Sequence, residues 1–544
     1  MTFRINRRSL LMTGTLGMGA FSVPGFAQTS NVSAAKGFTH SVASGEPASD
    51  AMLFWTRYVP NAEKQVELAL EVSKTDDFAR PVASGKVITG PWRDYTAKLA
   101  LDGLEPATVY YYRFRAPDGS VSPVGMTKTL PEDGLKAFRA AIFSCSNLPY
   151  GYFNAYGHAA DRSDIDLAVH LGDYFYEYKQ GGYAPAGGAV DGRWPQPVGE
   201  IVHLDDYRLR YASYRADPDL QRLHQMKPMI AQWDDHESAN DSWEGGAQNH
   251  QPGEEGSWDA RKAASIQAYR EWMPVSDEPW KAYDIGGLAT LFRTETRLLG
   301  RTEQPDIAPL FKTADPAKAL AGFRDGKWED PAATMMGSEQ EIWLADAMAA
   351  SVKGGKKWQV VGFGTIMGET RAPASAMDWV APDAEDRVKN YVRAGVLAGK
   401  LGLPMNFDNW GGYPAARARF LKSAQEMGSD LVVISGDSHN AWAYDLAQGG
   451  ERAGVEFAGH SVTSPGYESA IKVDPKRMAD ALVGANPELK WCDTSNRGYM
   501  VMTIEPDRVT NQWLFCDTIL KKSNNLRIGQ TASVLRGQKV LSGV

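Results

Sequence analysis

The feature that most constrains the fold is a short apolar run that stops at side chains able to bind a metal. The run covers residues 167–171; Gly172 and Asp173 follow it, and Tyr176 comes three residues later. Short apolar runs bounded by turn signals are typical of strands buried in a parallel or mixed sheet. Open α/β sheets bind their ligands at the carboxyl ends of such strands. We therefore expect Asp173 and Tyr176 to lie at a ligand-binding edge of a sheet.

Four further apolar runs are expected to be strands of the same α/β domain. They cover residues 140–143, 228–233, 358–361 and 431–434. Three of the four end at Cys145, at Asp235 with His236, and at Asp437 with His439. One such ending would be weak support, because single motif matches are often accidental. The repetition in one region predicts that these side chains form one cluster.

The segments between the runs are expected to surround this cluster. Residues 181–197 and 245–256 are rich in glycine, proline and polar residues, which is typical of long functional loops that overhang a site. Residues 259–273 place apolar side chains near one helical face and are followed by Pro274, so they are predicted to form a helix.

The rest of the chain suggests a second, smaller domain before the α/β domain. Residues 37–131 alternate short strand-like runs with turns, a spacing typical of a small β-sandwich of immunoglobulin or fibronectin type. The α/β domain is expected to span residues 137–519. Residues 520–544 are rich in lysine, asparagine, serine and glycine, and are expected to be a C-terminal tail or a docked helix.

Residues 1–27 have the features of an export signal. Arg7 and Arg8 precede an uncharged run that is too short for a confident membrane span, so no transmembrane segment is expected in the mature protein. The arginine pair resembles a twin-arginine leader, which implies the twin-arginine export machinery as a partner and a periplasmic or extracellular location. An ordinary secretory leader that carries two arginines is the alternative.

Charge and cysteine content limit the function classes. The formal net charge of -8 gives no electrostatic support for a nucleic-acid-binding domain. An acidic protein that handles an anionic substrate needs a local positive field, which bound metal ions commonly supply. The chain has three cysteines, so at least one thiol is unpaired, and Cys492 and Cys516 remain a possible pair in an oxidising compartment.

The side chains at the strand ends form a mixed set of oxygen, nitrogen and sulfur donors. The candidate metal ligands are Cys145, Asp173, Tyr176, Asp235, Asn240, Asp437 and His439. A tyrosine binds as phenolate only to a strong Lewis acid, which favours Fe3+, whereas carboxylates and an amide suit Ca2+, Mg2+ or Mn2+. Two or more ions can bridge a phosphate, activate a water and stabilise the leaving oxygen.

Several motifs together resemble the PhoD-like alkaline phosphatases, within the calcineurin-like metallophosphoesterase superfamily. They lie at residues 38–47, 172–177, 233–240, 436–439 and 496–499. The resemblance implies a β-sandwich followed by a four-layer α/β/β/α phosphatase domain that binds a ferric ion and two calcium ions. By position, Cys145, Asp173 and Tyr176 look like ferric ligands. Asp437 and His439 match the closing metal motif, and Asp235 and Asn240 match the middle one.

The resemblance also suggests roles for some other residues. His236 stands where metallophosphoesterases keep a histidine that assists the leaving group, and the alternative is a histidine that orients Asp235. Arg208 and Arg297 are candidates for phosphate contact, but ordinary ion pairs are favoured. The sequence departs from the family at Gly411 and Glu295, where the family usually has an acidic residue and an aspartate. The remaining histidines are expected to be structural: His40, His158, His170, His203, His224, His250 and His460.

The favoured function is an exported metal-dependent alkaline phosphatase. It would hydrolyse phosphomonoesters, with diesters as a further option, by in-line attack of a metal-activated water or hydroxide. A phosphodiesterase of phospholipase D or teichoic-acid-degrading type is the first alternative. A cell-envelope binding protein in which the metal is only structural is the second.

Overall fold

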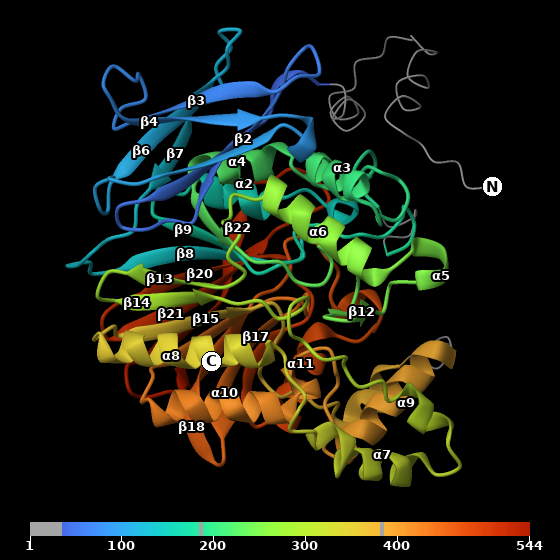
Figure 1. Ribbon diagram of the computed structural model, residues 1–544. Helices are drawn as coiled ribbons and strands as arrows, with labels where there is room; N and C mark the ends of the chain where they lie inside the picture. Colours follow the sequence, from blue (N-terminus) through green and yellow to red (C-terminus); the bar gives the residue numbers. More distant parts are fainter. Residues whose placement is uncertain (1–34, 184–188, 381–385) are drawn as a thin grey trace.

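Two large β-sheets pack face to face in the centre of the protein, and helices cover their outer faces (Figure 1). The computed structural model describes residues 35–183, 189–380 and 386–544. The expected leader at residues 1–27 lies outside the described residues. Among the described residues, no helix combines the length and apolar character that a membrane crossing requires.

The first sheet has ten strands and contains three of the runs that end at candidate ligands. In order across the sheet the strands are β23 (Leu541–Ser542), β22 (Leu526–Leu535), β21 (Arg508–Cys516), β20 (Gly498–Ile504), β8 (Phe138–Phe143), β9 (Leu167–His170), β10 (Pro228–Ala231), β1 (Gly37–Gly45), β2 (Met52–Val59) and β5 (Thr96–Leu101). Strands β8, β9 and β10 are parallel neighbours. Their carboxyl ends therefore reach the same edge of the sheet, as the apolar runs predicted.

The second sheet has seven strands and contains the other two predicted runs. Its order is β13 (Lys281–Ile285), β14 (Ala289–Arg293), β15 (Trp358–Phe363), β16 (Leu431–Ser435), β18 (Glu451–Ala458), β17 (Ala441–Gln448) and β19 (Leu489–Asp493). Both faces of β16 are buried, because Val432 and Ile434 pack between the two sheets while Leu431 and Val433 pack against the outer helices. This two-sided burial explains why the run is continuously apolar.

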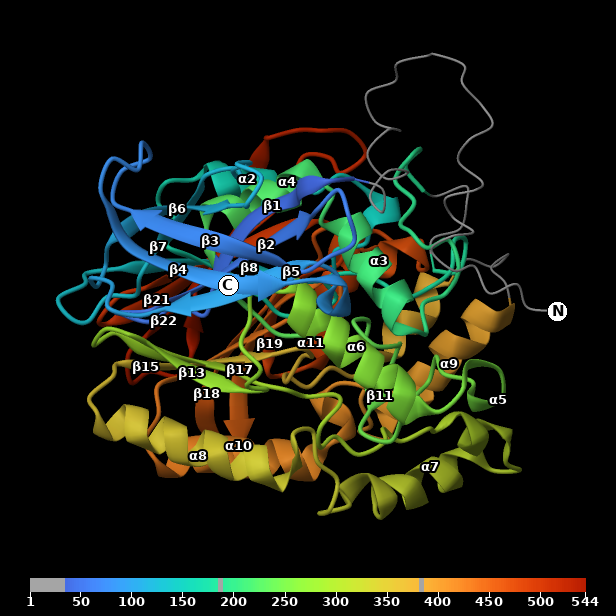
Figure 2. The ribbon, with the colours of Figure 1, turned by 45° about the horizontal axis from the view of Figure 1, so that its top comes forward.

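The helices form an outer layer on each side (Figure 2). One core lies between the ten-stranded sheet and α2 (Asn154–Asp161), α3 (Leu204–Tyr214), α4 (Pro218–Met226) and α6 (Trp258–Trp272). Another lies between the seven-stranded sheet and α8 (Gly337–Lys353), α10 (Pro414–Glu426) and α11 (Pro475–Ala485). Helix α6 matches the predicted helix, with a Ser257 side chain that caps its first turn.

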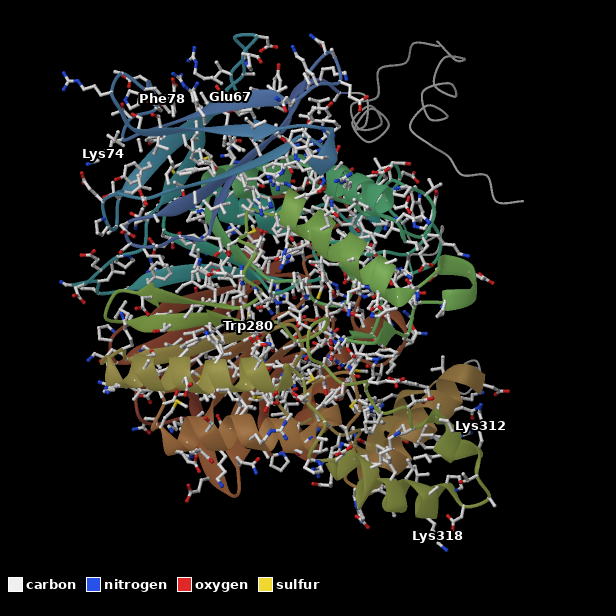
Figure 3. The ribbon with its side chains drawn as sticks, viewed as in Figure 1. Glu67, Lys74, Phe78, Trp280, Lys312 and Lys318 are labelled. Carbon is white, nitrogen blue, oxygen red and sulfur yellow. The ribbon has the colours of Figure 1, made fainter. Side chains whose placement is uncertain are left out.

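Two further helices lie at one end of the protein, away from the N-terminal strands (Figure 1). Helices α7 (Pro316–Arg324) and α9 (Asp386–Lys400) share a small core around Leu320 and Leu403. Figure 3 shows Lys312 and Lys318 on this outlying part and Glu67 on the opposite end of the molecule. The short elements α5 (Pro252–Glu255), β11 (Ser242–Trp243) and β12 (Gly246–Ala247) lie in and beside the predicted loop 245–256.

The N-terminal strands form a region that resembles a β-sandwich. Its outer sheet has the order β4 (Pro81–Thr89), β3 (Val66–Ser73), β6 (Val109–Arg115) and β7 (Gly125–Lys128). The facing strands β1, β2 and β5 belong to the ten-stranded sheet, because β1 pairs in parallel with β10. The sandwich is therefore continuous with the α/β part rather than separated from it by a flexible linker.

The C-terminal segment corrects one expectation. Residues 520–544 were predicted to be a tail or a docked helix, but they contribute β22 and β23 to the edge of the ten-stranded sheet. Ala532 and Val534 are buried and alternate with the more exposed Thr531, Ser533 and Leu535, which is the pattern of a strand with one face on the core. The polar composition reflects the outer face of this strand. Cys492 and Cys516, the possible pair, are both free thiols.

A buried ion pair links the N-terminal region to the second sheet and gives a first prediction. Glu46 lies 2.5 Å from Arg293 Nη1 and accepts a hydrogen bond from Tyr283 Oη at 2.9 Å. Glu46→Gln is expected to lower the free energy of unfolding at pH 7 by about 3 kcal/mol, because it leaves a buried guanidinium without its counter-charge. Urea denaturation of both proteins measures the difference.

The difference in unfolding free energy between the wild type and Glu46→Gln should become smaller as the pH falls. Burial opposes ionisation of Glu46, but Arg293 and Lys281 outweigh it and lower its pKa. A carboxyl whose pKa is lowered by folding stabilises the protein above its unfolded pKa and loses this effect as the pH falls. The difference between the wild type and Glu46→Gln should therefore begin to shrink as the pH falls below about 4 and continue to shrink as Glu46 becomes protonated in the folded state. A constant difference down to pH 3 would contradict this role for the ion pair.

Candidate metal centre

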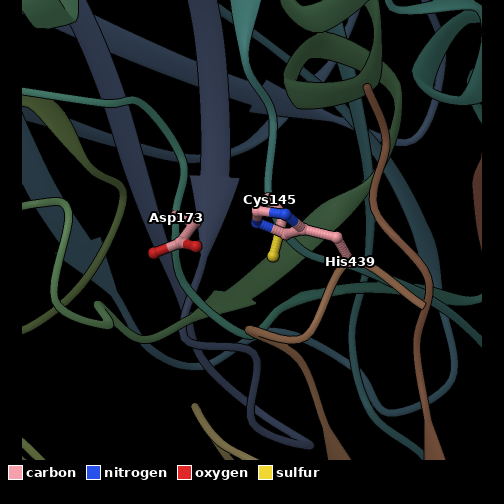
Figure 4. A group of neighbouring side chains, drawn as sticks. All are labelled: Cys145, Asp173 and His439. Atoms are coloured by element: carbon pink, nitrogen blue, oxygen red, sulfur yellow. The ribbon is translucent and has the colours of Figure 1, made fainter. Parts of the chain in front are cut away.

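Strand ends from both large sheets bring candidate ligands to one place. Cys145 follows β8, Asp173 follows β9 and His439 follows β16. Ligand atoms of these three residues all lie within 4.8 Å of one another, and Figure 4 shows the Cys145 sulfur and the His439 ring side by side with Asp173 facing them. A second group, within the same limit, contains Asp173, Asp234, Asp235 and Asp437. Asp173 belongs to both groups, so the structure brings the predicted strand ends together.

The backbone at these positions is held in an unusual conformation. Cys145, Asp173, Asp437 and His439 have φ values of 62°, 54°, 66° and 62°. Residues other than glycine rarely adopt this left-handed region, and they persist there where the surrounding structure imposes it. Such strained residues concentrate at functional sites. The four predicted ligands with a positive φ all lie in turns that come after the end of a strand.

Tyr176 and His439 meet at the first group of ligands. Tyr176 Oη donates to Asp173 Oδ2 at 3.2 Å, lies 3.0 Å from His439 Nε2, and accepts a hydrogen bond from Ser464 Oγ at 2.6 Å. His439 Nδ1 lies 2.9 Å from the carbonyl oxygen of Pro465, which can only accept, so Nδ1 carries the proton. Burial lowers the pKa of His439 to about 3, so the ring is neutral and Nε2 presents its lone pair to the cluster.

His236 lies in contact with the carboxylates and is itself oriented by one. Its Nδ1 lies 2.7 Å from Glu177 Oε2, and its ring belongs to a group with Asp173 and Asp235 within 4.8 Å. Burial opposes protonation, but Asp235 and Glu177 outweigh it and raise the pKa of His236 well above its usual value. The Glu177 carboxylate can only accept, so Nδ1 of His236 carries a proton that it donates to Glu177.

Arg297 is a buried counter-charge rather than an exposed phosphate contact. Its guanidinium donates to Asp234 Oδ1 at 2.6 Å and to Asp408 Oδ1 at 2.8 Å, and lies 3.8 Å from Asp235. Arg208 likewise pairs with Glu271 at 2.6 Å. The ordinary ion-pair interpretation is thus correct for both arginines.

The sequence analysis missed two carboxylates that organise the centre. Asp234 directly precedes Asp235, and this adjacency was a usable signal. Glu237 accepts hydrogen bonds from the backbone N–H groups of Asp173, Tyr174 and Asp234, at 3.0, 2.7 and 2.9 Å. It thereby ties the turn after β9 to the turn after β10, and its place in the motif at residues 233–240 was the signal that could have found it.

Asn240 lies differently from the other candidate ligands. Its amide nitrogen donates to Gln248 Oε1 at 3.0 Å and its backbone N–H donates to Glu177 Oε1 at 2.8 Å. Its neighbour Asp241 instead forms a group with Asp235 and Asp408 within 4.8 Å. These contacts connect Asn240 to Glu177, the residue that orients His236.

Glu295, which stands where the family usually has an aspartate, makes a defined set of hydrogen bonds. Its carboxylate accepts hydrogen bonds from the backbone N–H groups of Arg297, Leu298 and Leu299, and from Trp233 Nε1. The side chain therefore caps the turn that carries Arg297. Gly411 lies in a short 3-10 helix, Trp410–Gly412, and is buried.

The residues present fit a metal centre. Asp173 Oδ1 and Asp235 Oδ1 are buried and make no hydrogen bond with any residue that the structure describes. Burial raises the pKa values of both Asp173 and Asp437, and nearby carboxylates add to this effect. Buried carboxylates without sufficient counter-charge are costly unless a cation joins them. A thiol, a phenol and an imidazole nitrogen complete a donor set of the kind that transition metals bind.

Comparisons with known proteins agree with this geometry. The family model "PhoD-like phosphatase" matches residues 140–513, and the model of its N-terminal domain matches residues 25–131. Alkaline phosphatase D of Bacillus subtilis (strain 168) is 31% identical over 534 residues, which cover 93% of this chain and 80% of that protein. A solved structure described as the structure of PhoD superposes with a TM-score of 0.75 at 27% identity, and covers 96% of this chain and 93% of the other. The chain belongs to the PhoD-like phosphatase family and is a phosphoric ester hydrolase.

Proposed function

We propose that this protein is an exported, metal-dependent alkaline phosphatase that acts on phosphomonoesters. The observation that carries the proposal is the convergence of two ligand groups on Asp173, with buried carboxylate oxygens that have no hydrogen-bond partner among the described residues. We assign residues 37–131 to an N-terminal sandwich. Residues 137–519, which follow it in the chain, are assigned to a four-layer metallophosphatase sandwich. The twin-arginine leader at residues 1–27 would direct the chain to the periplasm or the exterior.

The donor atoms suggest how the metals are distributed. Cys145, Asp173, Tyr176 and His439 offer sulfur, oxygen and nitrogen donors suited to Fe3+. Asp173, Asp235 and Asp437 offer the oxygen donors that Ca2+ prefers, and two calcium ions would balance the carboxylates. When bound, such cations polarise the phosphoryl oxygens and lower the pKa of a water molecule.

The chain's own residues then supply orientation and a proton. His236 is held by Glu177 through Nδ1, so its Nε2–H is directed away from Glu177 and toward the side of the carboxylates. The nearby carboxylates raise the pKa of His236, which favours the protonated ring that a donor to the leaving oxygen requires. Glu237 fixes the backbone of both ligand turns, and Ser464 fixes the phenol oxygen of Tyr176.

Hydrolysis by the purified protein before and after chelation tests the proposal. The protein should hydrolyse p-nitrophenyl phosphate, lose this activity when a chelator removes calcium, and regain it when Ca2+ is restored. Bis-p-nitrophenyl phosphate, tested in parallel, reports on diester hydrolysis and on the phosphodiesterase alternative. Undiminished turnover by protein shown to be metal-free would contradict the proposal.

A further inference from the structure

Tyr183 lies against the metal centre without belonging to either ligand group. Its Oη is 3.3 Å from His439 Nδ1. Its ring lies nearly parallel to that of His236, at 15° with 6.5 Å between the centroids, and 5.4 Å from that of Tyr176. The hydroxyl is therefore next to the residue proposed to bind metal, and the ring faces the residue proposed to serve the leaving group.

The hydrogen bonds around His439 leave the phenol proton of Tyr183 unused. His439 Nδ1 must carry a hydrogen, because the Pro465 carbonyl oxygen 2.9 Å away can only accept. Tyr183 Oη therefore faces an N–H group and lies on the accepting side of that contact. Within the described residues, Tyr183 Oη makes no other hydrogen bond. Its own O–H is free to donate elsewhere.

The ring is held firmly in this position. Tyr150 Oη donates to the Tyr183 carbonyl oxygen at 2.9 Å, and the two rings pack edge to face. Tyr183 also borders a small cavity together with Tyr176, Tyr178 and Trp194. A donor that is fixed beside a reaction centre costs little reorganisation when a ligand arrives, which makes its hydrogen bond effective.

We propose that the Tyr183 hydroxyl donates a hydrogen bond to a phosphoryl oxygen of the bound phosphate ester. This inference rests on the proposed function, because it assumes that the ester binds at the same centre. The neutral hydroxyl adds no further charge to the centre. Its hydrogen bond to a charged phosphoryl oxygen would be stronger than a hydrogen bond between two neutral groups. Tyr183 is thus assigned as a catalytic residue that touches the substrate and does not bind the metal.

The test compares Tyr183→Phe with the wild type as metal-loaded enzymes, with inorganic phosphate as the binding probe. The variant keeps the ring and loses only the hydroxyl. Its inhibition constant for phosphate should rise about 10-fold, and its kcat/KM for p-nitrophenyl phosphate should fall by about 10- to 100-fold. Its metal content should equal that of the wild type. Tyr499→Phe, which loses a buried hydroxyl bonded to His158, is the control and should show neither change.

Two results would overturn the inference. One is a Tyr183→Phe enzyme whose phosphate inhibition and kcat/KM stay within about threefold of the wild type, since a hydrogen bond to a charged group should cost more. The other is a loss of metal in parallel with activity, which would make Tyr183 a support for His439. A wild type without phosphatase activity would instead refute the proposed function itself.

Discussion

Asp173→Asn is expected to lower kcat for p-nitrophenyl phosphate by at least about 1000-fold, because the residue is shared by both ligand groups. The substitution keeps the size of the side chain and removes its charge. The variant should also retain less metal per chain, which elemental analysis measures. Burial raises the pKa of Asp173, so the metal-free fold tolerates a neutral side chain there and should remain intact.

Asp166→Asn is a matched control on the same strand. Asp166 precedes the amino end of β9, pairs with Lys128 at 2.6 Å, and lies at the opposite end of that strand from Asp173. Its loss should leave kcat and metal content unchanged. Equal turnover by Asp173→Asn and the wild type would refute the assignment of Asp173 to the metal centre.

Arg297→Met is expected to lower the free energy of unfolding by about 3–5 kcal/mol. Arg297 is fully buried and pairs with Asp234 and Asp408. The variant leaves Asp234 without its counter-charge, whereas Asp408 keeps its ion pair with Arg301 at 2.5 Å. Urea denaturation of the metal-loaded proteins measures the loss. The double variant Arg297→Met with Asp234→Asn should recover part of the stability, because the charge left unpaired at Asp234 is then removed.

Arg222→Met provides the control for the loss of an arginine. Arg222 pairs with Asp161 on the surface, where both side chains are about half exposed, and the change should cost about 0–1 kcal/mol. Similar losses in Arg222→Met and Arg297→Met would contradict the view that Arg297 compensates buried charge.

The sequence predicted most of the cluster of candidate ligands because most of them lie just after the end of a strand. Cys145, Asp173 and Asp437 could be found from the apolar run before each, and parallel strands deliver their carboxyl ends to one edge. Asp408 follows no strand, and it reaches Arg297 only through the folding of a long loop. The unused proton of Tyr183 depends on which atom of His439 faces Pro465, which no sequence pattern encodes.

The fold was predictable to a similar extent. Strands with buried faces were apparent, whereas β4 contains a proline, a glycine and several exposed residues, so its local pattern does not indicate a strand. The polar residues in and around β22 hid its buried alternation, so the segment was predicted to be a tail or a docked helix. The pairing of β1 with β10 joins segments far apart in the chain, and local patterns carry no information about such pairing.

Anomalous X-ray scattering from crystals of the metal-loaded protein, measured on both sides of the iron absorption edge, is the most direct test of the central claim. The account predicts an iron peak between the Cys145 sulfur, the Asp173 carboxylate, the Tyr176 hydroxyl and the His439 ring, with calcium next to Asp235 and Asp437. The absence of any metal peak among these side chains, in crystals of enzyme that hydrolyses p-nitrophenyl phosphate, would contradict it.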